Sequence, residues 1–461
     1  MKGIGCASNS IKNFLIKYDY INYVVISFLF LVSCFYFAAI YAVMAYIIIV
    51  SIFSDIENII KYYLFILPFD ALFVIDYGVL KYLIRFFKLA LVLVIFVKFS
   101  LLCIKKKERF SYPCMALFVF YLFFVFSPIH SLNSVFDFAT IAPELMLILV
   151  VLSNKKIKNL PEFVKILAIA IIVSSLFGLL KDYSPRLQEV VANNYRGNTS
   201  ILRFQGLTTQ PNTLAALCAV CFSLFLIVKF YNKISWYNFA IYSVCLITIC
   251  VTTFSRNYLI AMSLAIYIFA IILLFKIDNK KLKISLLVSI NFVAVALVVF
   301  AAVKILNSEI FSHQDGFYLL TEEEQKAILA GKQFYDPGRF GLWKLYYKDI
   351  TSSFGVLLFG HGVGSLAIGK MSAHNIVLWG IWQIGLIGVL IYTAIVATLI
   401  LTYKKCKRIN YIASLVYIVP VLFGFLFDYN PFGKIVWVVL IILIRFIQAC
   451  EFNRKLTFKK V

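Results

Sequence analysis

His374 and three arginines, Arg203, Arg256 and Arg339, are the residues of this 461-residue chain whose types could do chemistry together. His374 directly precedes Asn375 and a long apolar segment. An imidazole with an ordinary pKa near ~6.5 can take a proton from a hydroxyl group at neutral pH. The position of His374 at the start of an apolar segment therefore makes it a candidate general base.

The three arginines each lie beside the end of an apolar segment or in a loop that contains glycine. Guanidinium groups stay charged and bind phosphate oxygens with two parallel hydrogen bonds. Arg203, Arg256 and Arg339 thus form a candidate anion site near the base. The alternative, equally open for Arg203 and Arg256, is that they anchor helix ends at the lipid headgroups. For Arg186 and Arg196 the anchoring or solvated role is favoured.

Other residues with reactive side chains have weaker context. His361 stands in the turn Gly360-His361-Gly362, where a backbone role for the glycines is favoured over catalysis by the histidine. Glu322 to Glu324 follow Thr321 as a capping box, so we interpret them as charges at the start of a helix and not as a metal site. No cysteine and histidine spacing suits a metal. We therefore expect neither a metal nor another cofactor.

The composition determines which elements must position these residues. Hydrophobic residues make up 63% of the chain and charged residues only 14%, against roughly 45–50% and about 25% in soluble domains. Apolar runs near the ~20 residues that cross a bilayer recur along the chain, among them 61–77 and 83–104. Pro211 fits the first turn of another such helix. We therefore expect an all-α, polytopic bundle of about 12 to 14 transmembrane helices, formed by residues 1–461 as a single integral membrane domain.

The net charge of +23 comes from basic clusters in alternate loops. By the positive-inside rule these loops and both termini are cytoplasmic, so the charge predicts membrane orientation and not nucleic-acid binding. The intervening loops, including 181–210 and the long 306–374, then face outward. Loop 306–374 has six Lys or Arg against seven acids, and we expect it to be partly helical. A short amphipathic helix is predicted at about 340–350, with Leu342, Leu345 and Tyr346 on one face.

Four segments, in order, resemble the O-antigen ligase and Wzy-type O-antigen polymerase superfamily of bacterial membrane glycosyltransferases. They are Arg203 to Ala215, Thr253 to Arg256, Gly338 to Trp343, and His374-Asn375 with Gly385 and Gly388. The resemblance covers about residues 200–390. Many members carry Glu nine residues after the histidine, where this chain has Gln383.

The resemblance implies a metal-independent, inverting transfer of a glycan from undecaprenyl diphosphate to an acceptor hydroxyl. It would occur on the outer face of the bacterial cytoplasmic membrane. His374 would be the base, Arg256 and Arg339 would bind the diphosphate, and Arg203 is a further candidate for the same role. The expected partners are the lipid-linked oligosaccharide donor, a glycan or lipid-linked acceptor, and the bilayer. A chain-length regulator is a further candidate.

Two related activities and one different class remain open. A polymerase would join lipid-linked repeat units, as in O-antigen or capsule synthesis, and we favour it over a ligase that transfers finished O-antigen to lipid A core. A lipid-linked glycan flippase is the alternative from another class. A transporter should place its polar residues near the membrane midplane and show internal repeats, whereas the candidates here are predicted at one surface.

Overall fold

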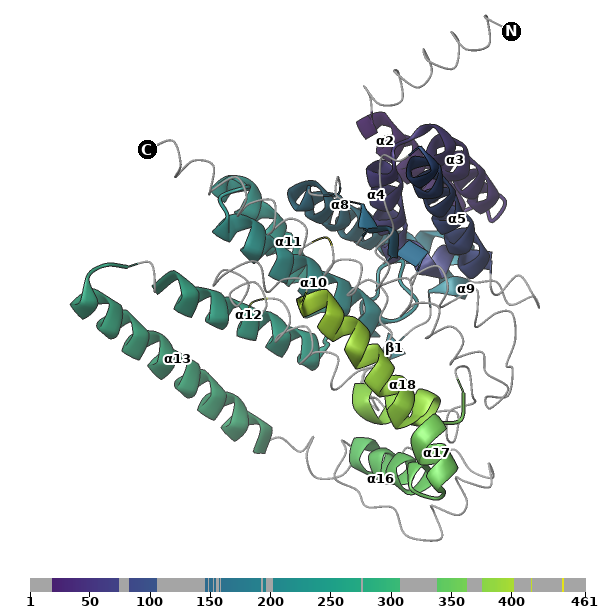
Figure 1. Ribbon diagram of the computed structural model, residues 1–461. Coiled ribbons are helices and arrows are strands. Elements are labelled where there is room, and N and C mark those ends of the chain that lie inside the picture. The colour runs from purple at the N-terminus through teal and green to yellow at the C-terminus, as the bar shows by residue number, and fades with distance from the viewer. Residues whose placement is uncertain are drawn as a thin grey trace, which may run out of the picture. The chain divides into compact units, whose positions relative to one another are not determined.

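In the computed structural model most of the described residues form α-helices (Figure 1), and the chain divides into two compact units. One unit comprises residues 1–118, 134–255 and 434–461, and the other comprises 119–133 and 256–433. The described residues are 19–73, 83–105, 146–147, 149–151, 153–154, 157, 159–191, 194–195, 202–274, 277–306, 338–362, 375–401, 416 and 442. The expected helical class is thereby confirmed.

Within the described residues the first unit contains eight α-helices, two 3-10 turns and one antiparallel pair of two-residue β-strands. In chain order they are α2 (Asp19–Ser33), α3 (Ala39–Phe53), α4 (Ile56–Ile66), η1 (Leu67–Phe73), α5 (Leu83–Ile104), α8 (Leu160–Gly178), η3 (Leu179–Tyr183), α9 (Pro185–Val190), β1 (Asn194–Tyr195), β2 (Leu202–Arg203), α10 (Pro211–Phe230) and α11 (Trp236–Thr252). Helix α10 is the most buried of the four candidate membrane spans and packs against α8 and α11, while α4 packs against α8.

Polar contacts show which ends of these helices lie together. The ammonium of Lys61, in α4, lies 2.6 Å from the carboxylate of Glu162, near the start of α8. At the far end of α8, the Ser174 hydroxyl donates to the carbonyl of Pro68, after the end of α4, at 2.5 Å. Helices α4 and α8 therefore run in parallel, and α10 returns antiparallel to them. The turn with Lys229 and Lys233 is thus at the opposite end from loop 202–210.

Within the described residues, the second unit contains a helical hairpin and a cluster of three helices. The hairpin is α12 (Arg256–Leu274) and α13 (Lys280–Leu306), and the cluster is α16 (Gly338–Ile350), α17 (Phe354–Phe359) and α18 (Ile376–Leu401). The predicted amphipathic helix at 340–350 is confirmed as α16, since Leu342, Leu345 and Tyr346 are at most 3% exposed. Leu342 and Tyr346 face the start of α18, where Tyr346 packs against Trp379 and Trp382.

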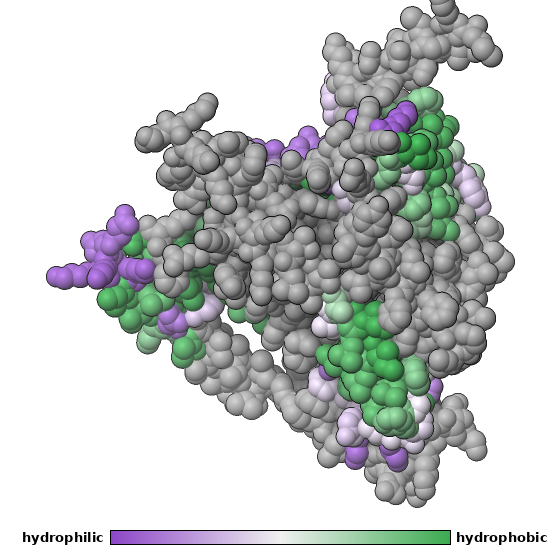
Figure 2. Space-filling model, viewed as in Figure 1, coloured by the Kyte–Doolittle hydropathy of each residue, from purple (hydrophilic) through white to green (hydrophobic). Residues whose placement is uncertain are grey.

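Four helices among the described residues are long and apolar enough to cross a membrane: Phe87–Ile104, Leu160–Tyr183, Pro211–Phe230 and Arg256–Leu274. Shorter apolar helices include Tyr20–Ser33 and Ala39–Phe53. On α2, Tyr20, Val24 and Phe28 form an apolar stripe that is more than 60% exposed, and hydrophobic residues also cover the visible side of α18 (Figure 2). Such a stripe is unusual against water but suits lipid. The total of 12 to 14 spans includes segments outside the described residues and stays a prediction.

Candidate functional site

The segment before α10 is fixed to two other parts of the first unit. The Ser174 hydroxyl, which donates to Pro68, also accepts a 3.2 Å hydrogen bond from the amide of Leu207. The carbonyl of Leu207 in turn accepts from the amide of Ala71 at 2.9 Å. Gly206, with φ +56°, makes the turn that this path requires. Loop 204–210 is therefore held against α8 and η1 by buried hydrogen bonds.

Arg203 links this loop to the end of α11. Its Nε donates to the carbonyl of Thr253 at 2.9 Å, and its Nη2 donates to Oδ1 of Asn212 at 2.5 Å. The Ser255 hydroxyl donates to the same Oδ1 at 3.0 Å. Two of the four segments that carry the family resemblance, Arg203 to Ala215 and Thr253 to Arg256, are thus joined through one amide oxygen. Binding of diphosphate by Arg203 stays a prediction.

The turn from Thr253 to Ser255 leads directly into Arg256, the first residue of α12. Phe254 has φ +50°, a left-handed conformation that is uncommon outside glycine. The Thr253 hydroxyl stabilises the turn, donating to the carbonyl of Cys250 at 2.6 Å and accepting from the amide of Ser255 at 3.2 Å. The predicted place of Arg256, between one apolar helix and the next, is confirmed, and its side chain is exposed.

Arg186 is bound to protein groups at the same end of the first unit. Its Nη2 donates to the carbonyl of Leu72 at 2.9 Å, and its guanidinium carbon lies 4.4 Å from the centre of the Phe37 ring. Burial lowers the pKa of Arg186, while the neighbouring Cys34 and Glu189 act to raise it. An arginine keeps its charge despite such a shift. These contacts give Arg186 a supporting role in packing α9 against η1.

Of the predicted site residues Arg339 and His374, the structure describes only the backbone of Arg339. Arg339 is the second residue of α16, so its backbone is helical and the helix begins slightly before the predicted start at about 340. His374 lies outside the described residues, as do Arg196 and Glu322 to Glu324. Asn375, directly after His374, caps α18: its Oδ1 accepts from the amides of Val377 and Leu378 at 3.0 and 3.2 Å. The roles predicted for Arg339 and His374 remain predictions.

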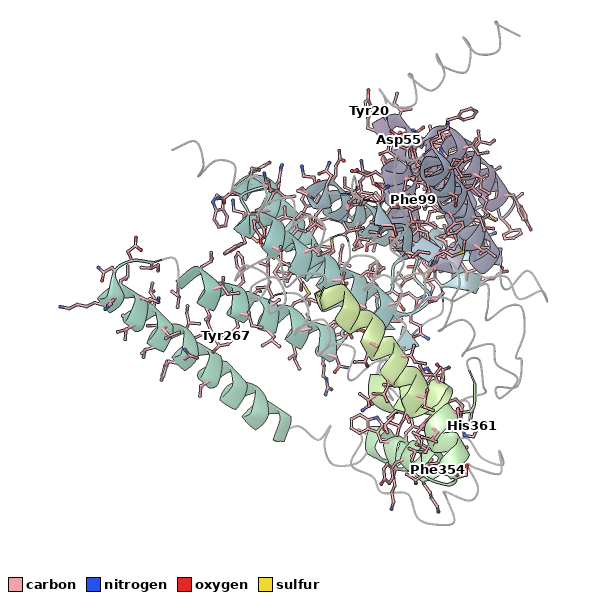
Figure 3. The ribbon with its side chains drawn as sticks, viewed as in Figure 1. Tyr20, Asp55, Phe99, Tyr267, Phe354 and His361 are labelled. Carbon is pink, nitrogen blue, oxygen red and sulfur yellow. The ribbon has the colours of Figure 1, made fainter. Side chains whose placement is uncertain are left out.

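His361 forms a cluster with two residues that the sequence did not link to it (Figure 3). The Nε2 atom of His361 lies 2.7 Å from Oδ2 of Asp349, in α16, and Nε1 of Trp382, in α18, donates to the same oxygen at 2.7 Å. The imidazole also packs on the Trp382 ring, with 5.1 Å between centroids. An ionised carboxylate only accepts hydrogen bonds, so the histidine nitrogen facing it carries the proton. His361 and Asp349 are both about one-third exposed.

The glycines around His361 do have the expected backbone role. Gly360 and Gly362 have φ of +73° and +96°, in the left-handed region. A Cβ on Gly360 would lie 2.6 Å from the carbonyl carbon of Gln383. No short motif could have predicted the contacts that Asp349 makes. Asp349 is 12 positions from His361 and 33 positions from Trp382 in the sequence.

No family model matches this chain, and no curated protein sequence matches it. The resemblance to O-antigen ligases and polymerases therefore rests on the four segments themselves. Among the described residues, no group of three or more His, Cys, Asp or Glu side chains is placed to hold a metal ion.

Proposed function

We propose that this protein is a membrane glycosyltransferase that polymerises lipid-linked glycan repeat units on the outer face of the bacterial cytoplasmic membrane. The donor would be an oligosaccharide on undecaprenyl diphosphate, and the acceptor a hydroxyl of a second glycan. Transfer to lipid A core by the same chemistry is the alternative, because the two activities differ only in the acceptor.

The observation that carries the proposal is the convergence of Arg203, Asn212 and Ser255. These residues belong to two segments, and the hydrogen-bonded pair Asn212 and Ser255 is 43 positions apart in the sequence. They form hydrogen bonds to one another at one end of the first unit, away from the basic turn at Lys229 and Lys233. A shared site would require such convergence from segments that resemble one family in order and spacing. The hydrogen bond between Ser255 and Asn212 also holds the residue that directly precedes the exposed Arg256.

In the proposed reaction His374 acts as the base, and Arg256 and Arg339 bind the diphosphate. His374 takes the proton of the acceptor hydroxyl as that oxygen attacks the anomeric carbon of the donor glycan. The bond from this carbon to the diphosphate oxygen breaks, and the lipid diphosphate leaves with the bonding electrons. Arg256 and Arg339 stabilise the charge that develops on the leaving group, which is the main requirement when the leaving group is already good. No metal enters this scheme.

Reconstitution tests the proposal. Purified protein in lipid vesicles is given a lipid-diphosphate-linked repeat unit, with and without lipid A core, and products are separated by length. Polymers formed without lipid A core support a polymerase, transfer that depends on the core supports a ligase, and no transfer to either contradicts a glycosyltransferase. His374→Ala should reduce transfer by about 10²- to 10⁴-fold, whereas the matched control His313→Ala, in the same predicted loop, should retain it.

Arg256→Lys and Arg339→Lys test the anion site. Lysine keeps the charge but lacks the planar fork, so both variants should transfer more slowly. Arg408→Lys, in a predicted cytoplasmic cluster, is the matched control. Full activity of both site variants would favour anchoring of helix ends over diphosphate binding.

A further inference from the structure

Helix α18 is broken at Gly385, nine residues after its start. Gly385 has φ +64° and ψ 177°, which no helix contains. A break interrupts the backbone ladder and leaves nearby carbonyls in need of other donors, which an apolar environment makes costly. The short first part of α18, from Ile376 to Ile384, is therefore held in place by contacts other than the rest of its own helix.

The turn at residues 360–362 supplies the donors at this break. The amide of His361 donates to the carbonyl of Trp382 at 2.8 Å, and the amide of Gly362 donates to that of Gln383 at 2.9 Å. The approach is so close that a Cβ on Gly385 would lie 2.1 Å from the carbonyl oxygen of Leu358. Gly360 and Gly385 are consequently needed for the turn and the broken helix to meet.

Asp349 ties the same two elements together through side chains. Its Oδ2 accepts from His361, which is in the turn, and from Trp382, which is in the first part of α18. Trp382 is 3% exposed and stacks on Trp379, so a shift of its indole would disturb the packing between α16 and α18. A single carboxylate oxygen thus connects α16, the turn and α18.

We propose that Asp349 is a positioning residue of the active site, acting through His361 and Trp382. It locks the turn 360–362 onto the break in α18 and so fixes the start of that helix, where Asn375 forms the cap. His374 directly precedes this cap. The inference rests on the proposed function, since it assigns to Asp349 the placement of the predicted base. Asp349 itself is not a catalytic residue.

Three variants test the connection at different atoms. Asp349→Ala removes the shared acceptor, Trp382→Phe removes one donor and keeps an aromatic ring, and His361→Gln keeps a side-chain donor at a similar reach. Misplacement of a reacting group by about 1 Å can cost about 10²-fold in rate. We expect kcat for glycan transfer to fall by about 10- to 100-fold in Asp349→Ala and less in Trp382→Phe, with the KM for the lipid-linked donor unchanged. His361→Gln should retain more activity than His361→Ala.

Hydrogen–deuterium exchange supplies a measurement that does not depend on activity. Asp349→Ala should speed exchange in peptides covering 360–362 and 375–385 but not in the α12–α13 hairpin, with a similar thermal midpoint in detergent. Asp278→Asn, an exposed acid between α12 and α13, and Trp236→Phe, an exposed tryptophan, are the matched controls.

The outcomes separate this inference from the proposed function. If the wild-type protein transfers glycan and Asp349→Ala and Trp382→Phe do so at the wild-type rate, the positioning role is wrong and the function stands. Equal loss in His361→Gln and His361→Ala, together with a lowered thermal midpoint in every variant, would also overturn it, since that pattern indicates global folding. If the wild-type protein transfers nothing but the exchange changes as expected, the proposed function fails while the structural lock is supported.

Discussion

Gly178 and Gly206 lie in direct backbone contact: a Cβ on Gly178 would be 2.6 Å from the Cα of Gly206. The first glycine ends α8, and the second makes the left-handed turn in the loop before α10. Their contact lets the loop lie close enough for Leu207 to reach Ser174. This approach is what places Arg203 and Asn212 beside the end of α11.

Gly178→Ala should destabilise the protein, because the added methyl group meets backbone atoms that cannot rotate away. Overpacking of this kind costs about 1–3 kcal/mol. The thermal midpoint of purified protein in detergent is the measurement. Gly355→Ala is the matched control, since its nearest atom is 3.8 Å away and alanine suits a helix better than glycine. Equal midpoints for Gly178→Ala and wild type would contradict the close approach.

Ser174→Ala should also lower stability, because the amide of Leu207 would lose its acceptor and the carbonyl of Pro68 its donor. Leaving buried polar groups without partners costs about 1–3 kcal/mol. Ser223 offers a control of the same chemistry: its hydroxyl is buried in α10 and has no hydrogen-bond partner. Ser223→Ala should therefore be close to neutral. A loss of equal size in both variants would mean that volume, and not the hydrogen bonds, matters at Ser174.

Asn212→Ala should slow glycan transfer, since it deprives both Arg203 and Ser255 of their common acceptor. The chain before Arg256 would then be less firmly held, and we expect about a tenfold loss in rate. Asn238→Ala, at an exposed position near the start of α11, is the control. Wild-type rates in Asn212→Ala would show that the network has no part in the activity.

Labelling with a membrane-impermeant maleimide should reveal which end of the first unit faces outward. Tyr183 is 79% exposed and lies in the loop 181–210 that is predicted to face outward. Tyr183→Cys should therefore react in intact cells. Lys233→Cys, in the basic turn between α10 and α11, should react only after the membrane is permeabilised. The signal is measured as the increase over the wild-type protein. The reverse pattern would invert the predicted orientation and remove the basis for an outward-facing site.

The helices were largely predictable, because their signals are local. The apolar run 83–104 coincides with α5, Pro211 begins α10, and the buried face of α16 follows from the spacing of Leu342, Leu345 and Tyr346. The apolar run at 61–77 predicted one spanning helix, and this prediction was less accurate. There, α4 ends at Ile66 and gives way to the 3-10 turn η1, whose Pro68 carbonyl is bound by Ser174.

The contacts at the candidate site were not predictable in the same way. The glycine-rich turn around His361 predicts only a backbone role, yet Asp349 and Trp382 contact the imidazole from two different helices. For Arg203 the sequence predicts only an anion ligand or an anchor. Its hydrogen bonds to Thr253 and Asn212 could not be predicted, because they depend on how α10 and α11 pack.

The sequence by itself determined the apolar helices, the alternation of basic loops and the order of the four motif segments, since hydrophobic length and charge act along the chain. Only the tertiary structure decided that Arg203, Asn212 and Ser255 share one oxygen, and that Asp349 joins His361 to Trp382. Buried polar groups must find partners wherever packing brings them. In these helices those partners come from distant segments, so they are fixed by packing and not by spacing.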